Sequence, residues 1–320
     1  RAKKTRAFTV TEGLSRSSKQ LTESVVSVVV AKRPLDQAQL DELEEMLIEA
    51  DLGHALAAFG KGEVFDEVYH LAAAVGVKLV TADPIRSIET NIEQTSALLR
   101  YVSTHGNIPT LLASSSEVYG KSAGVPFRES DDVAYGPTTV PRWSYACSKA
   151  VDEYLGLAYF AQRGLPVVIA RFFNTVGPRQ VGDYGMVLPR FVGAAIENKP
   201  IDVYGDGEQS RCFCDVRDVA SSLPRLLGTK ECHGRVFNVG SDQPITIRAL
   251  AELVVKTIGS TSTIKRIPYA QAYGENFEDL RQRRPDLSRV STAIGFNASI
   301  PIERTIKDLA AEIAGGRTAR

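Results

Sequence analysis

The chain lacks several features that mark special classes of protein. No stretch approaches eighteen consecutive apolar residues, so we expect no membrane span. Cysteine is scarce, with four in 320 residues and no CxxC pair, which argues against disulfides and against a zinc site. The 38 acidic and 38 basic residues balance, so no nucleic acid or other polyanion is expected as a partner. These absences favour a cytoplasmic protein without a bound metal.

The first sixty residues lack the glycine pattern of a nucleotide-binding turn. Before Glu63 the only glycines are Gly13, Gly53, Gly60 and Gly62, and their spacings do not form G-x-x-G-x-x-G. That turn lets a backbone approach a pyrophosphate at the start of a helix. The phosphate loop G-x-x-x-x-G-K-[ST] is absent from the whole sequence as well. A dinucleotide would therefore be bound poorly by this part of the chain.

Residues 1–60 are instead predicted to form a helical N-terminal segment. Within 35–48, Leu40, Leu43, Leu47 and Ile48 recur at helical spacing. Residues 15–23 and 33–53 are similar to the helical N domain of the bacterial signal-recognition-particle receptor. This similarity implies a natural or artefactual fusion in which helices replace another first unit. A competing interpretation takes the β-branched run 25–30 as a buried strand.

A tyrosine, a lysine and a serine form the most informative pattern in the chain. Tyr145 and Lys149 lie one helical turn apart on the same face. An ammonium beside a phenol favours the phenolate, so Lys149 is expected to lower the pKa of Tyr145 from about 10 towards neutrality. Ser115, in the run SSSEVYG thirty residues upstream, supplies a hydroxyl able to hydrogen-bond the same substrate oxygen. The combination predicts acid–base chemistry at a hydroxyl or carbonyl group.

From Glu63 onward, short apolar strands alternate with helices, which predicts an α/β fold with a Rossmann-like parallel sheet. The first unit of that sheet is apparently replaced by helices, and a smaller C-terminal lobe binds substrate. We expect a helical segment over 1–60, a dinucleotide-binding domain over 61–177 with a return strand near 235–240, and the substrate lobe mainly over 178–320. The expected strands are 64–71, 110–113, 167–171, 201–204 and 236–240, the expected helices are 92–103, 145–162, 191–197 and 247–258, and 178–189 is expected to be a loop.

Six ordered motifs resemble those of the extended short-chain dehydrogenase/reductase group, the NAD-dependent nucleotide-sugar epimerases and dehydratases. The resemblance covers residues 63–314. Asn91 opens an N-x-x-G-T-like segment in which Gln94 replaces the glycine. The motifs are VYHLAA at 68–73, NIEQT at 91–95, SSSEVYG at 114–120 with YACSK at 145–149, RFFNTVGPR at 171–179, YGDGEQSR at 204–211 with DVRDV at 215–219, and RRPD at 283–286.

The resemblance implies a role for each matching residue. It implies NAD as cofactor, a nucleotide-diphosphate sugar as substrate and a homodimer. The implied catalytic residues are Ser115, Glu117, Tyr145 and Lys149. The implied cofactor contacts are Leu71, Ala72, Ala73, Asn91, Tyr145 and Lys149, with Asp51 as a further candidate near adenine. The implied substrate contacts are Asn174, Leu188, Tyr204, Arg211 and Arg283, although Arg284 lies next to Arg283 and a register slip would exchange the two.

Family members share oxidation of the sugar at C4, and the fate of the resulting ketone distinguishes their reactions. Dehydratases carry an Asp-Glu pair, whereas this chain has Ser116-Glu117, which disfavours dehydration. The start of the helix at 142–149 resembles that of epimerases, so a UDP-hexose 4-epimerase is the first hypothesis. A UDP-glucuronate decarboxylase is the alternative, since Ser-Glu also occurs there. Two further hypotheses are a non-catalytic UDP-sugar-binding or fusion protein, and a targeting module carried by residues 1–60.

Overall fold

The computed structural model describes residues 28–31, 65–71, 73, 80, 83–122, 124–180, 186–273 and 280–318. Several sequence predictions fall outside these residues: Asp51, Ala72, the helix predicted over 35–48, and the receptor-like stretches at 15–23 and 33–53. Within the described residues, no helix is long and apolar enough to cross a membrane. The same residues contain no group of three or more metal-binding side chains.

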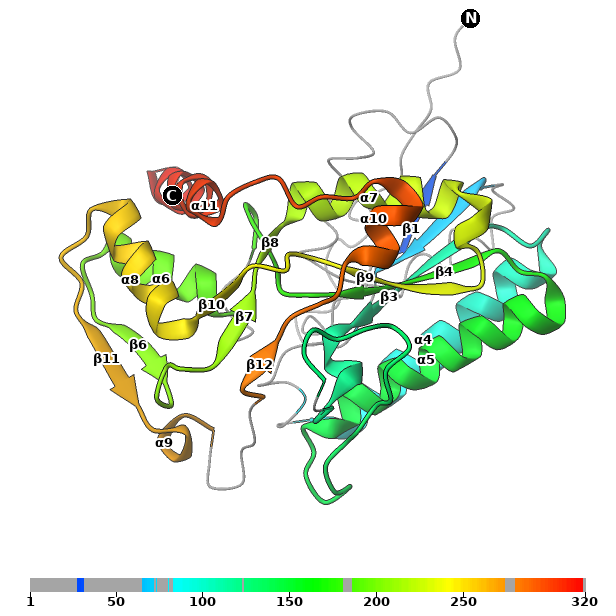
Figure 1. Ribbon diagram of the computed structural model, residues 1–320, viewed down its shortest axis with the longest axis horizontal. Coiled ribbons are helices and arrows are strands. Elements are labelled where there is room, and N and C mark those ends of the chain that lie inside the picture. The colour runs from blue at the N-terminus through cyan, green and yellow to red at the C-terminus, as the bar shows by residue number, and fades with distance from the viewer. Residues whose placement is uncertain are drawn as a thin grey trace, which may run out of the picture.

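A five-stranded sheet in the order β1-β2-β3-β4-β9 forms the centre of the larger unit (Figure 1). Four of its strands run parallel: β2 (Glu67–His70), β3 (Thr110–Ser115), β4 (Val167–Phe172) and β9 (Arg235–Val239). They are almost continuously buried, as expected for parallel strands covered on both faces. The predicted α/β fold with a Rossmann-like parallel sheet is confirmed.

The edge strand β1 (Val28–Ala31) runs in the opposite direction to its neighbour. Val28 pairs with His70 at the carboxyl end of β2, and Ala31 pairs with Glu67 at its amino end. The chain therefore leaves β1 at the edge of the sheet where the parallel strands begin. A ligand of an open parallel sheet binds at the other edge, where those strands end.

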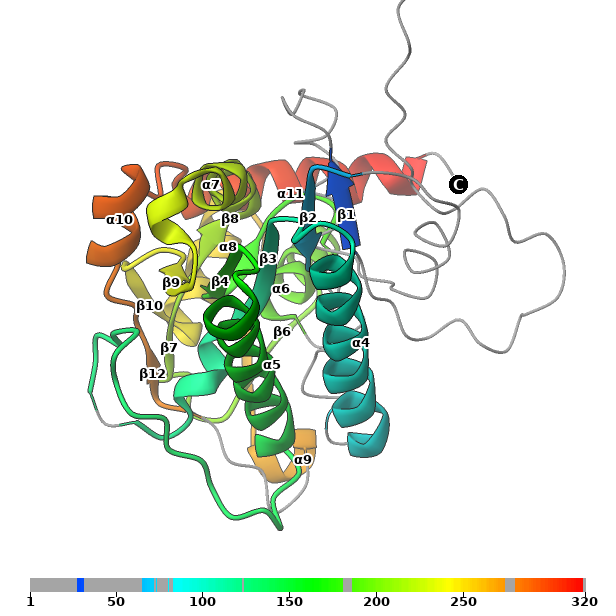
Figure 2. The same cartoon turned by 90° about the vertical axis from the view of Figure 1, so that its right-hand side faces the viewer.

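Helices cover both faces of the sheet (Figure 2). On one face lie α4 (Pro84–Thr104) and α5 (Trp143–Arg163), and on the other lie α7 (Val216–Gly228) and α10 (Ser288–Ile294). Because successive side chains of a strand point to opposite faces, Val167 and Ile169 of β4 pack with α4, while Val168 and Ala170 pack with α7.

Local signals explain where the two long helices begin and end. Asp83 precedes α4 and its carboxylate accepts a hydrogen bond from the backbone N–H of Arg86, while Pro84 occupies the first helical position. Gly164 ends α5 in the left-handed conformation, with φ of 66°. The start of α5 matters most for the site, because it places Tyr145 within its first turn.

The smaller lobe has its own apolar core, built by Leu188, Phe191, Val203, Leu250 and Val254 among others. Its elements lie to the left of the main sheet in Figure 1. They are α6 (Val187–Ile196), β6 (Ile201–Tyr204), β7 (Ser210–Cys212), β10 (Pro244–Thr246), α8 (Ile247–Ile258), β11 (Ile264–Ile267), α9 (Tyr269–Tyr273), β12 (Gln282–Arg283) and α11 (Ile302–Thr318). Short pieces complete the fold: η1 (Ser116–Tyr119), β5 (Thr175–Val176), β8 (Cys214–Asp215) and η2 (Lys230–Cys232).

Two sequence predictions differ from the structure. The loop predicted over 178–189 ends early, because α6 begins at Val187 and includes Pro189 in its first turn, where a missing backbone N–H costs no helical hydrogen bond. The second difference concerns 28–31, which form a strand rather than part of a helical segment. The competing interpretation of 25–30 as a strand agrees with the four residues described there.

Candidate active site

Ser115 and Tyr145 meet at the carboxyl edge of the sheet. Ser115 is the last residue of β3, and its hydroxyl accepts a hydrogen bond from the backbone N–H of Glu117 at 3.2 Å, which starts η1. The Ser115 side chain lies close enough to the Tyr145 phenol to lower its pKa, against the larger effect of burial. Tyr145 is only 9% exposed and packs against Ala73, which follows β2. The structure thus brings together the hydroxyl and the phenol that the sequence predicts to share a substrate oxygen.

Lys149 follows one turn after Tyr145, but its ammonium is held by another group. Lys149 Nζ donates to Asp152 Oδ2 at 3.2 Å, and both side chains are almost fully buried. Burial raises the pKa of Tyr145 above its usual value, and the charges of Glu117 and Asp152 raise it further. The Ser115 side chain and the Arg283 charge act in the opposite direction. The prediction that Lys149 lowers the Tyr145 pKa towards neutrality is therefore wrong for this state of the site.

Glu117 lies between two guanidinium groups. Its Oε1 is 2.7 Å from Arg283 Nη1, and its Oε2 is 3.4 Å from Arg142 Nη2. All three side chains are at most 15% exposed. The buried Nε of Arg283 has no hydrogen-bond partner within the described part of the chain. Among these three described side chains two cations face one carboxylate, an arrangement that suits an anionic substrate group.

The predicted diphosphate contacts lie on the smaller lobe and on the strands that join it to the sheet. Arg211 on β7 pairs in register with Arg283 on β12, so the two arginines are neighbours. Arg211 donates to the carbonyl oxygens of Ser210 and Leu280, both at 2.8 Å. Asn174 has a φ of 23° and donates from Nδ2 to Cys212 O at 3.3 Å. The structure itself therefore selects Arg283 over Arg284 as the arginine facing Glu117.

The remaining predicted contacts that the structure describes are two for the substrate, Leu188 and Tyr204, and two for the cofactor, Asn91 and Leu71. Leu188 is fully buried in the core of the smaller lobe. The Tyr204 ring lies under the Arg190 guanidinium, 4.3 Å from its centre. Asn91 on α4 donates from Nδ2 to Ser148 Oγ on α5 at 3.1 Å, which links the two helices beside Lys149. Leu71 is buried directly after β2.

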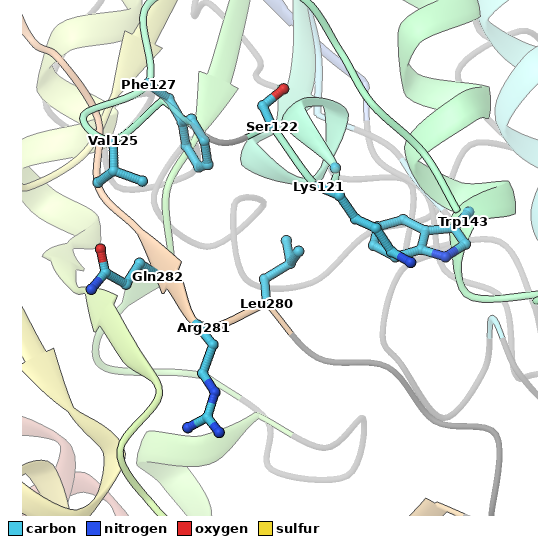
Figure 3. Close-up of a pocket in the computed structure, with 9 residues that line it drawn as sticks. Lys121, Ser122, Val125, Phe127, Trp143, Leu280, Arg281 and Gln282 are labelled. Atoms are coloured by element: carbon cyan, nitrogen blue, oxygen red, sulfur yellow. The ribbon is translucent and has the colours of Figure 1, made fainter. Parts of the chain in front are cut away.

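A cavity of about 490 Å³ lies between the segment after η1, the start of α5 and the segment that leads into β12 (Figure 3). Trp143, the only tryptophan of the chain, lines it, with the Lys121 ammonium 5.3 Å from the centre of the indole. Its lining comes from the segment after η1, from the start of α5 and from β12, namely Gly120, Lys121, Ser122, Val125, Phe127, Trp143, Leu280, Arg281 and Gln282. Because Trp143 lines this space, its fluorescence reports on ligands entering it.

Sequence reasoning missed Arg142 and Asp152. Asp152 lies three residues after Lys149, a spacing that places both side chains on one helix face, so helical periodicity contains a signal for this pair. Arg142 directly precedes α5, and nothing in its local sequence indicates that it contacts Glu117 twenty-five residues earlier. His70 on β2 is buried, and its side chain is hydrogen-bonded to Thr95.

The described residues fit one half of an NAD molecule better than the other. Tyr145, Lys149 and Ala73 gather at the carboxyl edge of the sheet, where the nicotinamide and its ribose would bind. Next to β2, however, the antiparallel β1 occupies the position of a parallel first strand, and its exit at Ala31 lies at the opposite edge. The sequence before residue 63 also lacks the glycine spacing of a pyrophosphate turn.

Comparison with known proteins identifies the relatives of the chain. UDP-N-acetyl-alpha-D-glucosaminuronate decarboxylase of Bacillus cytotoxicus is 38% identical over 244 residues, which are 76% of this chain and 75% of that protein. UDP-glucuronic acid decarboxylase 1 of Danio rerio is 32% identical over 238 residues, 74% of this chain, but the chain spans only 54% of that protein.

The chain is also similar to solved structures of two nucleotide-sugar epimerases. UDP-glucuronic acid 4-epimerase from Bacillus cereus, in complex with UDP-glucuronic acid and NAD, is 28% identical with a TM-score of 0.68, covering 81% of this chain and 78% of that one. UDP-glucose 4-epimerase from Thermotoga maritima, at 22% identity and a TM-score of 0.73 over 86% of this chain and 82% of that one, shares the fold. The model of the NAD dependent epimerase/dehydratase family matches residues 14–240, and the chain belongs to that family.

Proposed function

We propose that the chain decarboxylates a UDP-hexuronate. The observation that carries this proposal is the net positive cluster of Arg142, Arg283 and Glu117 beside Tyr145. Both substrate classes carry the diphosphate, and a hexuronate differs from a neutral hexose by the C5 carboxylate that it can offer to this cluster. Two relatives with substantial identity are named decarboxylases of such sugars, which also supports the proposal.

The chemistry follows from the position of the carboxylate relative to C4. A ketone at C4 makes the C5 carboxylate that of a β-keto acid, so the C5–C6 bond breaks with loss of CO2 and its electron pair passes to the C4 oxygen. C5 then takes up a proton. When bound, the nicotinamide cofactor of this family supplies the hydride acceptor and donor for the oxidation and reduction at C4.

The residues of the chain have distinct parts in this scheme. Ser115 and Tyr145 donate hydrogen bonds to the C4 oxygen, where negative charge develops as CO2 departs. Oxidation at C4 transfers the hydroxyl proton to the Tyr145 oxygen and reduction returns it, so the phenol is the form present while CO2 departs. Burial and neighbouring carboxylates raise the pKa of Tyr145, which favours this protonated form. The Arg283 guanidinium, with its unpartnered Nε, holds the sugar carboxylate before it departs. Glu117 keeps both arginines in place.

The test uses UDP-glucuronate and UDP-N-acetylglucosaminuronate labelled with ¹³C at C6, with NAD supplied. Labelled CO2 is expected, and NMR of the sugar should show a pentose without a C6 carbon. Inversion at C4 with retention of the label would overturn decarboxylation in favour of a uronate 4-epimerase, an outcome for which the similarity to the Bacillus cereus enzyme provides a reason.

A matched pair of variants tests the arginine. Arg283→Met should weaken UDP-hexuronate binding by about 10- to 100-fold, the effect of losing a charged hydrogen bond, and should affect UDP-glucose much less. Arg284→Met is the control, because Arg284 is exposed and adjacent in sequence. Binding is followed by Trp143 fluorescence. Equal effects of the two substitutions would contradict the assignment of Arg283.

We also propose that the chain forms a homodimer through α4 and α5. Five of the six exposed large apolar side chains lie on these two helices: Ile85, Ile88, Val151, Tyr154 and Phe160. Tyr154 is 71% exposed and Ile85 is 68% exposed, which is unusual for such residues in a monomer with a large buried core. A second copy presenting the same two helices would cover them.

A further inference from the structure

Four polar side chains are buried in a row between β2, α4 and α5: His70, Thr95, Asp152 and Lys149. His70 Nε2 and Thr95 Oγ1 are 2.9 Å apart, and the Thr95 side chain lies close enough to Asp152 to oppose the rise of its pKa. Asp152 in turn accepts from Lys149 Nζ at 3.2 Å. All four side chains are at most 3% exposed. The chain of contacts runs without a break from the sheet to the ammonium group.

Only one of these groups can compensate the buried ammonium charge. Burial and the nearby Lys149 charge lower the pKa of His70 to about 3, so the imidazole is neutral at physiological pH. Burial raises the pKa of Asp152, while Lys149 and the Thr95 side chain oppose that rise. An unpaired charge in such surroundings is costly. Lys149 and Asp152 therefore act as a coupled pair, and the position of one depends on the other.

Only one of the two Asp152 carboxylate oxygens has a hydrogen-bond partner among the described residues. Asp152 Oδ1 is buried and accepts no hydrogen bond from the described residues, although Oδ2 binds Lys149. An ion pair with a purely structural role would be more stable if both carboxylate oxygens accepted hydrogen bonds. The spare oxygen leaves the ammonium a second place to bind on the same carboxylate, so Asp152 can retain Lys149 in more than one position.

We propose that Asp152 is a positioning residue that acts through Lys149: its carboxylate anchors the ammonium one helical turn from Tyr145 and determines how much of that positive charge reaches the phenol. The functional meaning of this inference rests on the proposed function, in which the Tyr145 phenol donates to the C4 oxygen. The inference itself concerns only the ionisation of Tyr145. Within the described part of the chain, the charged and titratable groups that influence Tyr145 or Lys149 are Asp152 on the same helix, Glu117 on η1, Arg283 on β12 and His70 on β2.

The test measures the ionisation of Tyr145 directly. The full chain is labelled with 3,5-difluorotyrosine, whose more acidic phenol brings the titration into an accessible pH range, and is followed by ¹⁹F NMR. The Tyr145→Phe variant identifies the Tyr145 signal among the eleven tyrosines. Asp152→Asn should lower the titration midpoint by about one pH unit or more, since it removes a nearby negative charge and releases the ammonium. Asp202→Asn, an exposed aspartate on β6, is the control and should leave the midpoint unchanged.

A second pair of variants distinguishes an effect of Asp152 through Lys149 from a direct electrostatic effect of its charge on Tyr145. The same Asp152→Asn substitution is made in a Lys149→Met chain. If Asp152 acts through Lys149, the shift of the Tyr145 midpoint should fall to less than half of its value in the parent chain. An equal shift in both backgrounds, or an unchanged midpoint in Asp152→Asn alone, overturns the proposal. Should Asp152→Asn fail to fold by circular dichroism, Asp152→Ser takes its place with the same expected shift.

This readout needs neither substrate nor turnover, so it is independent of the proposed reaction. A chain that releases no labelled CO2 but shows the Lys149-dependent shift supports the positioning role and contradicts only the decarboxylation. A chain that releases CO2 without the shift contradicts the role of Asp152 alone.

Discussion

Substituting Glu153 should destabilise the protein more than almost any other single polar substitution. Glu153 lies on α5 and accepts from Arg171 on β4 through two hydrogen bonds, Nε to Oε1 at 2.8 Å and Nη2 to Oε2 at 2.7 Å. The Ser114 hydroxyl on β3 donates to the same carboxylate. One side chain thus ties the helix that carries Tyr145 to the strand that carries Ser115.

The magnitude follows from burial. Arg171 and Glu153 are each 6% exposed, so neither charge has water as an alternative partner. Glu153→Gln leaves the guanidinium buried without a counter-charge, and breaking such a pair costs about 3–5 kcal/mol. Arg304→Met is a matched control, because Arg304 pairs with Asp308 one helical turn away at the surface. Its guanidinium is 66% exposed, and such pairs contribute less than about 1 kcal/mol.

Urea unfolding followed by Trp143 fluorescence measures both effects, since Trp143 is the only tryptophan and is 2% exposed in the folded state. The double substitution Glu153→Gln with Arg171→Met removes both charges and should cost less than the two single substitutions added together. A loss below about 1 kcal/mol for Glu153→Gln would refute the reasoning, because a buried charge would then have been left unpaired at little cost.

Three further predictions concern pH, assembly and the cofactor. Because the His70 pKa is depressed to about 3, the unfolded chain binds more protons than the folded one between about pH 6.5 and pH 3. The free energy of unfolding should therefore fall as the pH drops through this window, and His70→Gln should flatten the slope in pH-dependent urea titrations; an unchanged slope would show that His70 is not its source. Tyr154→Lys should convert a dimer into a monomer in sedimentation velocity, whereas Val125→Lys, at an exposed apolar residue that belongs to neither α4 nor α5, should not; a persistent dimer in Tyr154→Lys would exclude this interface. Saturation-transfer NMR with NAD should show stronger contacts at the nicotinamide and its ribose than at adenine, and the reverse order would contradict the half-site implied by the antiparallel β1.

Much of the architecture was predictable because the physics behind it is local. The strands around Leu111 and Val168 are apolar runs bounded by polar residues, and the helix around Tyr145 has an apolar stripe at helical spacing, so their extents follow from periodicity. Ser115 lies just after the predicted strand 110–113, so the sequence also predicts its position at the ends of the strands where ligands bind.

The direction of β1 and the partners of the charged residues were not predictable in the same way. An apolar β-branched run around Val28–Ala31 indicates a strand, but its direction depends on the path of the chain before and after it. The contact between Arg142 and Glu117 likewise depends on how η1 and α5 meet in space. The Tyr145 pKa illustrates the consequence: the spacing to Lys149 predicted a lowered value, and the unanticipated Asp152 pairs with that lysine while burial raises the value.

The distribution of charge in the site bears on the choice between decarboxylation and 4-epimerisation. Lys149 and Asp152 neutralise each other beneath the phenol, so the net positive charge lies on the other side, at Arg142 and Arg283. Oxidation of the C4 hydroxyl is common to both reactions, so the groups around Tyr145 do not distinguish them. A substrate that also carries a C5 carboxylate presents a further anion, for which Arg142 and Arg283 offer cations.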